Sequence, residues 1–315
     1  MSIDMKLQSS VVPASARAVE LDRRSFLAGL GPGVCQIVFG DFPGGAFGRP
    51  LLTLAHCADP QLGFCRVDGA DRPLPGAYEE DLARVEREID IINKLNVDVA
   101  LFCGDMVHEA SDMTKDWPRL LKRFKVPVVV APGNHDVGNE VDSEKLALFK
   151  SVFGADYRSV TVNGWKIIAT NAQYAHTPGI EQVAHDAWLD QELMDGKSSR
   201  MPMIVMNHIP PFADSLLESD SYNNLPSAGR IDYLEKMVSA GVRFHLSGHL
   251  HRTLKREYGR MPILNPEVTC RSFDSRPLGF RILKIYSEGG VYTWEYVSVT
   301  SSDRESEGTS AEDSV

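Results

Sequence analysis

The chain has 315 residues, a hydrophobic content of 43%, a charged content of 24% and a formal net charge of -10. This composition is typical of a soluble globular protein, and the length suits two domains or one large α/β domain. The negative charge argues against a nucleic-acid-binding protein that relies on a basic surface. It does not exclude a small anionic substrate, because bound divalent metals reverse the local field. The cysteines match neither a zinc knuckle nor a disulfide framework; they are Cys35, Cys57, Cys65, Cys103 and Cys270.

Residues 1–49 form an N-terminal extension that resembles a bacterial export signal. Arg23 and Arg24 precede Ser25-Phe26-Leu27-Ala28 and an uncharged, mostly apolar stretch at residues 29–40. Paired arginines before a short apolar segment resemble a twin-arginine signal, so we expect export to the periplasm. The alternative is a disordered extension on a cytoplasmic protein. The apolar stretch is too short and too rich in glycine to span a membrane, and no later segment qualifies, so we predict no membrane span.

The folded domain is expected at residues 50–299, and its first half alternates strands with helices. Short apolar runs rich in β-branched residues predict strands at residues 51–57, 97–103 and 126–130. Apolar residues spaced three and four apart predict a helix at residues 77–95. Shorter helices are expected at residues 117–124 and 143–153.

The second half continues with a hairpin, two helices and further strands. Asn163-Gly164 is a typical two-residue hairpin turn between strands at residues 159–162 and 165–170. Helices are expected at residues 183–195 and 230–240, and strands at 203–206 and 242–246. The remainder is expected to be mostly β, including residues 280–286 and 291–299. Residues 300–315 are rich in serine and acidic side chains and are expected to be a disordered tail.

Chemically reactive side chains follow five of the predicted strands. Each one has an ordinary explanation, since Gly-Asp after a strand is often a turn and a single histidine at a strand end is often a surface residue. In α/β folds, however, ligands bind beyond the carboxyl ends of the strands, and five coincidences indicate one site. The residues are Asp59 and Gln61, Asp105, Asn134 and His135, His208, and His249 and His251.

The residue types at these strand ends indicate a metal centre. Oxygen and imidazole ligands without a thiolate suit Mn, Fe or Zn better than they suit a structural zinc site. The ligands outnumber what one ion needs. Two ions about 3.5–4 Å apart that share one carboxylate would use them all. Asp105 is the expected bridging ligand.

The order and spacing of these motifs resemble the calcineurin-like metallophosphoesterase signature. The resemblance covers roughly residues 51–298 and includes Asp59-x-Gln61, Gly104-Asp105, Gly133-Asn134-His135-Asp136, His208 and Gly248-His249-x-His251. It implies an α/β fold with a four-layer α/β/β/α sandwich and one active site. The Asp59-Pro60-Gln61 block further resembles a subgroup of calcineurin-like phosphoesterase domain-containing proteins that is described as serine/threonine-protein phosphatases.

The resemblance also implies a role for each matching residue. The first ion would be held by Asp59, Gln61, Asp105 and His251, and the second by Asp105, Asn134, His208 and His249. A hydroxide that bridges two divalent or trivalent ions (Mn, Fe or Zn) would attack the phosphorus in line. His135 would act as the general acid that protonates the leaving oxygen. The implied enzyme is a binuclear metal-dependent phosphoric ester hydrolase, a phosphatase or a phosphodiesterase.

Two positions differ from most of the family. Most members have histidine where Gln61 stands, and a neutral amide is a weaker ligand, although glutamine is normal in the Asp-Pro-Gln subgroup. His108 lies three residues after Asp105, where related enzymes have a metal ligand or a residue that orients the catalytic histidine. His108 could therefore ligate a metal, support His135 or be a surface residue; we favour support of His135, through a hydrogen bond from one ring nitrogen to His135 or Asp136.

Three functions remain open after the sequence is considered. The leading hypothesis is a phosphoesterase that acts on a phosphorylated small molecule or a phosphoprotein. The alternatives are a non-catalytic metal-binding scaffold of the same fold and a phosphodiesterase or nuclease of the superfamily. The acidic net charge makes nucleic acid an unexpected substrate. The sequence leaves the substrate, the metal and the oligomeric state undefined.

Overall fold

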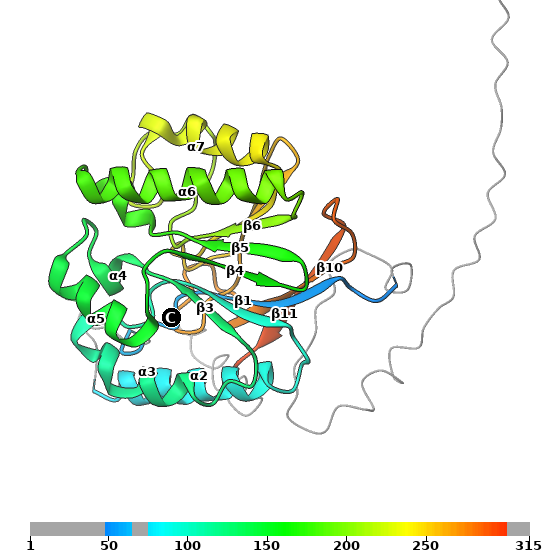
Figure 1. Ribbon diagram of the computed structural model, residues 1–315. Helices are drawn as coiled ribbons and strands as arrows, with labels where there is room; N and C mark the ends of the chain where they lie inside the picture. The colour runs from blue at the N-terminus through cyan, green and yellow to red at the C-terminus, as the bar shows by residue number, and fades with distance from the viewer. Residues whose placement is uncertain (1–47, 65–74, 301–315) are drawn as a thin grey trace, which may run out of the picture. The chain divides into compact units, whose positions relative to one another are not determined.

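Figure 1 shows a computed structural model of the chain, which describes residues 48–64 and 75–300. The arginine pair of the expected export signal and residues 301–315 of the expected tail lie outside the described residues, as do Cys35 and Cys65. Within the described part, two β-sheets pack against each other and helices cover the outer face of each sheet.

The first sheet has the strand order β11-β10-β1-β2-β3. Strands β1 (Leu52–Cys57), β2 (Val99–Cys103) and β3 (Val128–Ala131) are parallel, so their carboxyl ends lie at one edge. The chain returns through β10 (Gly279–Ile285), which pairs antiparallel with β1, and β11 (Tyr292–Ser298) completes the sheet.

The second sheet has the strand order β4-β5-β6-β7-β9-β8. Its parallel centre consists of β5 (Trp165–Ala169), β6 (Met203–Met206), β7 (Val242–Leu246) and β9 (Met261–Asn265). The edge strands β4 (Arg158–Val162) and β8 (Leu254–Tyr258) pair antiparallel with their neighbours. The predicted Asn163-Gly164 turn connects β4 to β5.

Both faces of the parallel strands β1, β2 and β3 are buried, which explains why these strands are mostly apolar. Because side chains alternate along a strand, Leu52 and Leu54 of β1 face the second sheet. Ala55 and Cys57 face the helical layer that contains α2 (Ala77–Ile92), α3 (Met113–Leu121) and α5 (Ser143–Phe153). The outer face of the second sheet packs against α6 (Ile180–Ser198) and α7 (Ser227–Ala240). The predicted four-layer α/β/β/α sandwich is confirmed.

Several element boundaries differ from the sequence prediction. Helix α3 begins at Met113, four residues before the predicted start. The buried Met113 side chain lies on the same apolar face as Trp117 and Leu120 and so adds one turn at the start of the helix. The sequence predicts only a mostly β region after residue 251, and the structure resolves β8 and β9 within it. The structure also has a four-residue helix α4 (Asn134–Val137) and two 3₁₀ helices, Ala110–Asp112 and Ala172–His176, that no sequence pattern indicated. None of the helices in the described part of the chain has both the length and the apolarity needed to cross a bilayer.

Candidate metal centre

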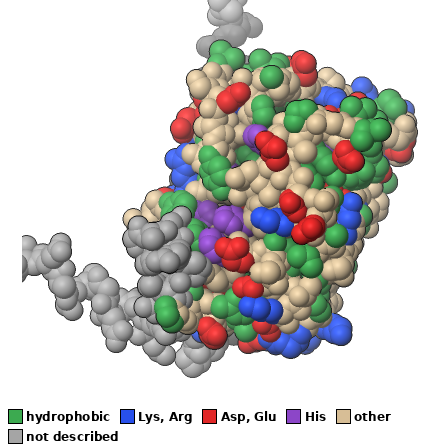
Figure 2. Space-filling model, turned by 90° about the vertical axis from the view of Figure 1, so that its left-hand side faces the viewer, with side chains coloured by type: hydrophobic (Ala, Val, Ile, Leu, Met, Phe, Trp, Pro, Cys, Tyr) green, Lys and Arg blue, Asp and Glu red, His purple; other side chains and the backbone are tan. Residues whose placement is uncertain are grey.

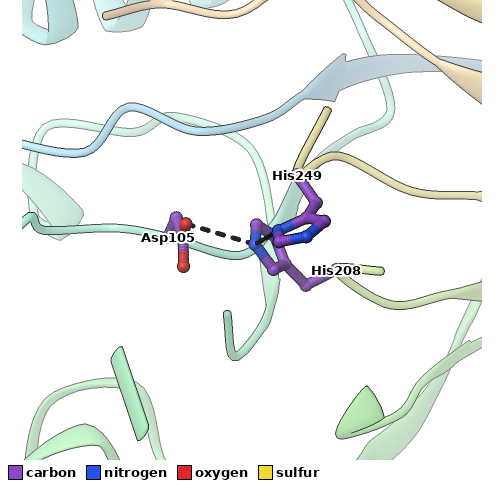
Figure 3. A group of neighbouring side chains, drawn as sticks. All are labelled: Asp105, His208 and His249. Carbon is purple, nitrogen blue, oxygen red and sulfur yellow. Dashed lines mark hydrogen bonds and ion pairs between the residues drawn. The ribbon is translucent and has the colours of Figure 1, made fainter. Parts of the chain in front are cut away.

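Three side chains from three strand ends meet at the centre of the site (Figure 3). Asp105 follows β2, His208 follows β6 and His249 follows β7. The His208 Nε2 atom lies 3.2 Å from Asp105 Oδ2 and 3.1 Å from His249 Nδ1. One ligand atom from each residue lies within 4.8 Å of the other two, and all three side chains are buried. The two sheets therefore jointly build one compact group of metal-ligand types.

Asn134, the first residue of α4, belongs to the same group. Its Oδ1 atom lies 3.1 Å from His208 Nε2, and its Nδ2 atom donates to the Tyr222 hydroxyl at 2.8 Å. The amide oxygen, which is the atom that can ligate a metal, thus faces the imidazoles.

A second group lies around Asp59. Its Oδ1 atom is 3.5 Å from His251 Nε2, and its Oδ2 atom accepts from the backbone N–H of His249 at 2.9 Å. The buried Gln61 amide is placed by Cys270, whose thiol donates to Gln61 Oε1 at 3.6 Å. His249 therefore connects the two groups, while the Gln61 side chain contacts Cys270.

Most of the predicted ligands have an unusual backbone conformation. A positive φ is rare for residues other than glycine and costs about 1–3 kcal/mol each, so it persists only where the surroundings impose it. Such residues are known to gather at functional sites. Here they are Asp59 (φ 50°), Gln61 (33°), Asp105 (53°), His249 (71°) and His251 (49°).

Two glycines are required by close approach inside the site. A Cβ atom on Gly133 would lie 2.1 Å from Asp105 Oδ1, and one on Gly104 would lie 2.7 Å from His208 Nδ1. Both distances are shorter than any tolerated contact. The Gly-Asp and Gly-Asn pairs of the sequence therefore exist because the loops after β2 and β3 press directly against the ligand side chains.

The imidazoles of the site are fixed in one tautomer each. A carbonyl oxygen can only accept a hydrogen bond, so a ring nitrogen that contacts it must carry a proton, and in the neutral ring the other nitrogen has the lone pair. In each case the nitrogen with the lone pair is the one that faces the ligand group. The bonds run from His208 Nδ1 to Cys103 O (2.7 Å), from His249 Nε2 to Tyr222 O (2.6 Å) and from His251 Nδ1 to Arg271 O (2.6 Å).

Burial and neighbouring charges shift the pKa values of the ionisable groups in the site. Burial raises the pKa of the Asp59 carboxyl. Burial alone would also raise the pKa of Asp105, but the neighbouring imidazoles of His208 and His135 outweigh it and lower that pKa. Burial alone would lower the pKa of His208, but the Asp105 carboxylate raises it to about 9. Burial lowers the pKa of His249 to about 3. In the metal-free protein, His208 therefore carries a second proton, on Nε2, whose positive charge lies beside the Asp105 carboxylate; a bound metal ion would replace this proton.

The residues of the site fit a metal ion. Asp59 Oδ1 is fully buried and has no hydrogen-bond partner among the described residues. A buried carboxylate oxygen without a partner is costly, and a bound cation removes that cost. Two carboxylates, two amide oxygens and three imidazole lone pairs are a suitable donor set for Mn, Fe or Zn.

His135 lies at the edge of the site with a different set of contacts. Its backbone N–H donates to Asp105 Oδ1, and its Nδ1 atom donates to the backbone carbonyl of His108, both at 2.9 Å. The His108 ring stacks between His135 (4.9 Å between centroids) and Phe64 (4.7 Å). His108 thus contacts His135 through its carbonyl and its ring face, where the sequence argument expected a bond from a ring nitrogen. His135 is only partly buried, and Figure 2 shows a group of imidazoles that reaches the surface on one face.

Several residues that shape the site had no role in the sequence argument. The buried Asp136 carboxylate accepts from the backbone N–H groups of Met106, Val107 and Gly133 and so joins the loops after β2 and β3. Its position three residues after Gly133 is a helix-capping signal that could have been noticed. The carbonyl groups that orient the imidazoles leave no signal in the sequence, because any residue type offers one.

Comparison with known proteins agrees with this geometry. The sequence model described as calcineurin-like phosphoesterase matches residues 52–253, which is more than half of the chain. The chain belongs to the calcineurin-like phosphoesterase family. This membership confirms the fold and makes the chain a metal-dependent hydrolase of phosphoric esters.

Two curated relatives show the range of activities among similar proteins. The chain is 32% identical to serine/threonine-protein phosphatase CPPED1 of Bos taurus, over 73% of this chain and 79% of that protein. It is 23% identical to the 3',5'-cyclic adenosine monophosphate phosphodiesterase CpdA of Haemophilus influenzae, over 78% of this chain and 89% of that protein. Similar proteins thus include a phosphatase and a phosphodiesterase.

Two solved structures share the fold at low sequence identity. A dimetal phosphatase from Danio rerio aligns with a TM-score of 0.55 and 13% identity, over 80% of this chain and 97% of that chain. GAP50, described as the anchor in the inner membrane complex of Plasmodium, aligns with a TM-score of 0.52 and 14% identity, over 79% and 85% of the two chains. At this identity the likeness concerns the fold alone.

Proposed function

We propose that the site holds two metal ions and hydrolyses phosphate monoesters. The observation that supports this most directly is the orientation of the three buried imidazoles, which each donate one N–H to a carbonyl and turn the other nitrogen toward the ligand group. The first ion would be held by Asp59, Gln61, Asp105 and His251. The second ion would be held by Asp105, Asn134, His208 and His249, with Asp105 shared between them.

The metal ions would supply Lewis acidity, a nucleophile at neutral pH and a clamp for the phosphoryl oxygens. The chain contributes the orientation of the donors. Hydrogen bonds to backbone carbonyls keep the lone pairs aimed at the ions, and the backbone N–H of His135 fixes Asp105 Oδ1. These contacts exist before any substrate arrives, so the ligands need no rearrangement.

His135 would be the proton donor for the leaving oxygen. Its Nδ1–H is committed to the His108 carbonyl, so Nε2 is the atom that can carry a second proton to the substrate. The stacked His108 and Phe64 rings prevent the imidazole from rotating away. We assign His108 the supporting role, through its carbonyl and its ring face.

A phosphorylated small molecule or a phosphoprotein is the substrate class we propose. The support is the greater similarity to CPPED1, at 32% identity, than to CpdA, at 23%.

The test is a panel of p-nitrophenyl phosphate, bis-p-nitrophenyl phosphate, a phosphoserine peptide and DNA, assayed after chelation and addition of Mn²⁺, Fe²⁺ or Zn²⁺. We expect turnover of monoesters. Turnover of the diester alone would make the chain a phosphodiesterase, and no turnover of any compound with two ions bound would favour a scaffold.

The two-ion assignment is tested by Asp105→Asn. The exchange removes the one charge that both ions would share, so we expect loss of activity and release of at least one ion per chain. Asp90→Asn on the exposed side of α2 is a matched control and should keep two ions. Elemental analysis that finds two ions and full turnover in the Asp105 variant would contradict the assignment.

We further propose that the Arg23-Arg24 pair directs export to the periplasm. The support is the sequence alone, since an apolar stretch follows the pair at residues 29–40. Replacing both arginines by lysine should leave the protein in the cytoplasm of a bacterial host. Exported protein should have lost roughly its first 45 residues. An intact N-terminus on cytoplasmic protein from the native host would refute this proposal.

A further inference from the structure

Tyr222 lies in the connection between β6 and α7 and contacts two of the proposed ligands of the second ion. Its ring centroid is 4.5 Å from that of His249, and its hydroxyl accepts from Asn134 at 2.8 Å. The residue nevertheless keeps 58% of its surface exposed, so the side chain contributes little to the core. An exposed aromatic residue that contacts two proposed metal ligands is better explained by the site than by packing.

The backbone of Tyr222 determines which nitrogen of His249 is free. The Tyr222 carbonyl accepts from His249 Nε2 at 2.6 Å, so the proton is on Nε2 and the lone pair is on Nδ1. The Nδ1 atom is the one that lies 3.1 Å from His208 Nε2, inside the ligand group. Without this carbonyl the imidazole could turn or exchange its tautomer.

The hydroxyl of Tyr222 holds the Asn134 amide in place. Without this contact the amide could rotate about its side-chain bonds, because the hydroxyl is the group that anchors its outer end. Here Nδ2 donates to the Tyr222 hydroxyl, and Oδ1 consequently lies 3.1 Å from His208 Nε2. Loss of the contact would leave the amide free to rotate and to move Oδ1, the atom that can ligate a metal, away from the proposed ion.

The loop that carries Tyr222 is held by polar contacts within the same connection. Glu218 accepts from the backbone N–H groups of residues 213, 214 and 215 and from Asn224 Nδ2. Arg230 is 2% exposed and donates to the carbonyls of Leu216, Glu218 and Leu225. The segments on either side of Tyr222 are therefore fixed by their own hydrogen bonds, and the loop can present its backbone and its hydroxyl in constant positions.

We propose that Tyr222 is a positioning residue for the second metal ion, which orients His249 through its carbonyl and Asn134 through its hydroxyl. The inference rests on the proposed two-ion function. It assigns to Tyr222 no contact with the reacting atoms. Because the first ion would be held by Asp59, Gln61, Asp105 and His251, the effect of Tyr222 is confined to the second ion.

The test is Tyr222→Phe, which removes the hydroxyl and keeps the ring and the carbonyl. Loss of a residue that orients metal ligands typically weakens metal binding about 10–100-fold. Mn²⁺ binding, measured by titration against a competing chelator, should show about 10-fold weaker affinity for one of two ions and an unchanged affinity for the other. Tyr258→Phe is the matched control, since its hydroxyl bonds Glu235 away from the site. The thermal midpoint of the metal-free protein should be the same for wild type and both variants.

The possible results separate this inference from the proposed function. Two Mn²⁺ ions bound by Tyr222→Phe with wild-type affinities would overturn the role of Tyr222 and leave the two-ion centre intact. Equal weakening of both ions, or a lower thermal midpoint without metal, would assign the hydroxyl a general structural role and so overturn the inference as well. Failure of the wild-type protein to bind two ions would overturn the proposed function and this inference with it.

Discussion

Single hydrogen bonds decide the chemistry of this site, because they turn each imidazole so that a particular nitrogen is free. For His208 and His251 the free atom is Nε2, whereas for His249 it is Nδ1. The same rule leaves Nε2 of His135 available outside the buried group. Residue identity alone therefore does not define a ligand or an acid; the carbonyl that each ring contacts completes the assignment.

His135→Ala should lower turnover and leave both metal ions bound. A general acid typically contributes about 10²–10⁴-fold, and its contribution shrinks when the leaving group needs no proton. We therefore expect a large loss with an alkyl phosphate and a small loss with p-nitrophenyl phosphate, at unchanged metal content. A loss of the same size for both substrates would show that His135 does not act as the acid.

Gly133→Ala should disrupt the ligand group although it replaces one small residue by another. The added Cβ would lie 2.1 Å from Asp105 Oδ1 and 2.3 Å from the Asp105 nitrogen, and Asp105 is buried. We expect weaker metal binding and a loss of about 1–3 kcal/mol in the free energy of unfolding, measured by urea denaturation. At Gly48 a Cβ would meet nothing within 4 Å, so Gly48→Ala serves as the control. Equal stabilities and metal affinities for the two variants would contradict the packing argument.

The sequence could predict that these residues share one region, but not how each is turned. Asp105, His208 and His249 each follow an apolar run, and parallel strands bring their carboxyl ends to one edge. The orienting carbonyls of Cys103, Tyr222 and Arg271 could not be found in this way. They are supplied by backbone positions whose side chains are irrelevant to the contact.

At the level of elements, strands were predicted more accurately than the loops and short helices between them. Strand β6 was predicted at its observed bounds, because its four residues form a continuous apolar run that is buried throughout. Helix α4 was missed because its four residues are too few for a periodic pattern. The Asp136 carboxylate stabilises its first turn by accepting from the N–H of Gly133. The same carboxylate also accepts from Met106 in the loop after β2, so the helix depends on a contact with a distant part of the chain.

Helix α2 carries a buried acid that should make stability depend on pH. Glu88 is fully buried against Cys57 and Thr269, and burial raises its pKa from 4.5 to about 7. The folded state therefore holds the proton more tightly than the unfolded state. Stability attributable to Glu88 is highest below the unfolded value and falls as the pH rises toward the folded pKa.

Glu88→Gln should remove this dependence, because the amide stays neutral at every pH. Relative to wild type, the variant should gain stability as the pH rises from about 4.5 to about 7, up to about 3 kcal/mol above that range. Urea denaturation of both proteins in chelator across this range measures the difference. Glu79→Gln, at the exposed start of the same helix, is the control and should differ from wild type by a constant amount. A constant difference for Glu88→Gln as well would mean that folding does not raise the pKa of Glu88.

For the molecule as a whole, the proposed ions would join the two sheets. Asp59, Asp105 and Asn134 follow strands of the first sheet, whereas His208, His249 and His251 follow strands of the second. The layers already share an apolar interface that contains Leu54 and Leu101 on one side and Ile204 and Leu246 on the other. At the carboxyl edge this interface ends and charged groups take its place. A cation bound there would connect the two sheets where no apolar contact does.

Metal removal should therefore destabilise the entire sandwich and not just its active-site loops. A ligand that binds only the folded state at about 100 times its dissociation constant adds about 2.7 kcal/mol. For a domain of this size that corresponds to a rise of roughly 5–10 °C in the thermal midpoint. We expect midpoints from far-ultraviolet circular dichroism to fall after chelation and to recover when Mn²⁺ is added. Asp105→Asn should show a much smaller rise with Mn²⁺, because it lacks the carboxylate that both ions would share. Equal midpoints for the chelated and the fully loaded wild-type protein would mean that the ions do not couple the two sheets.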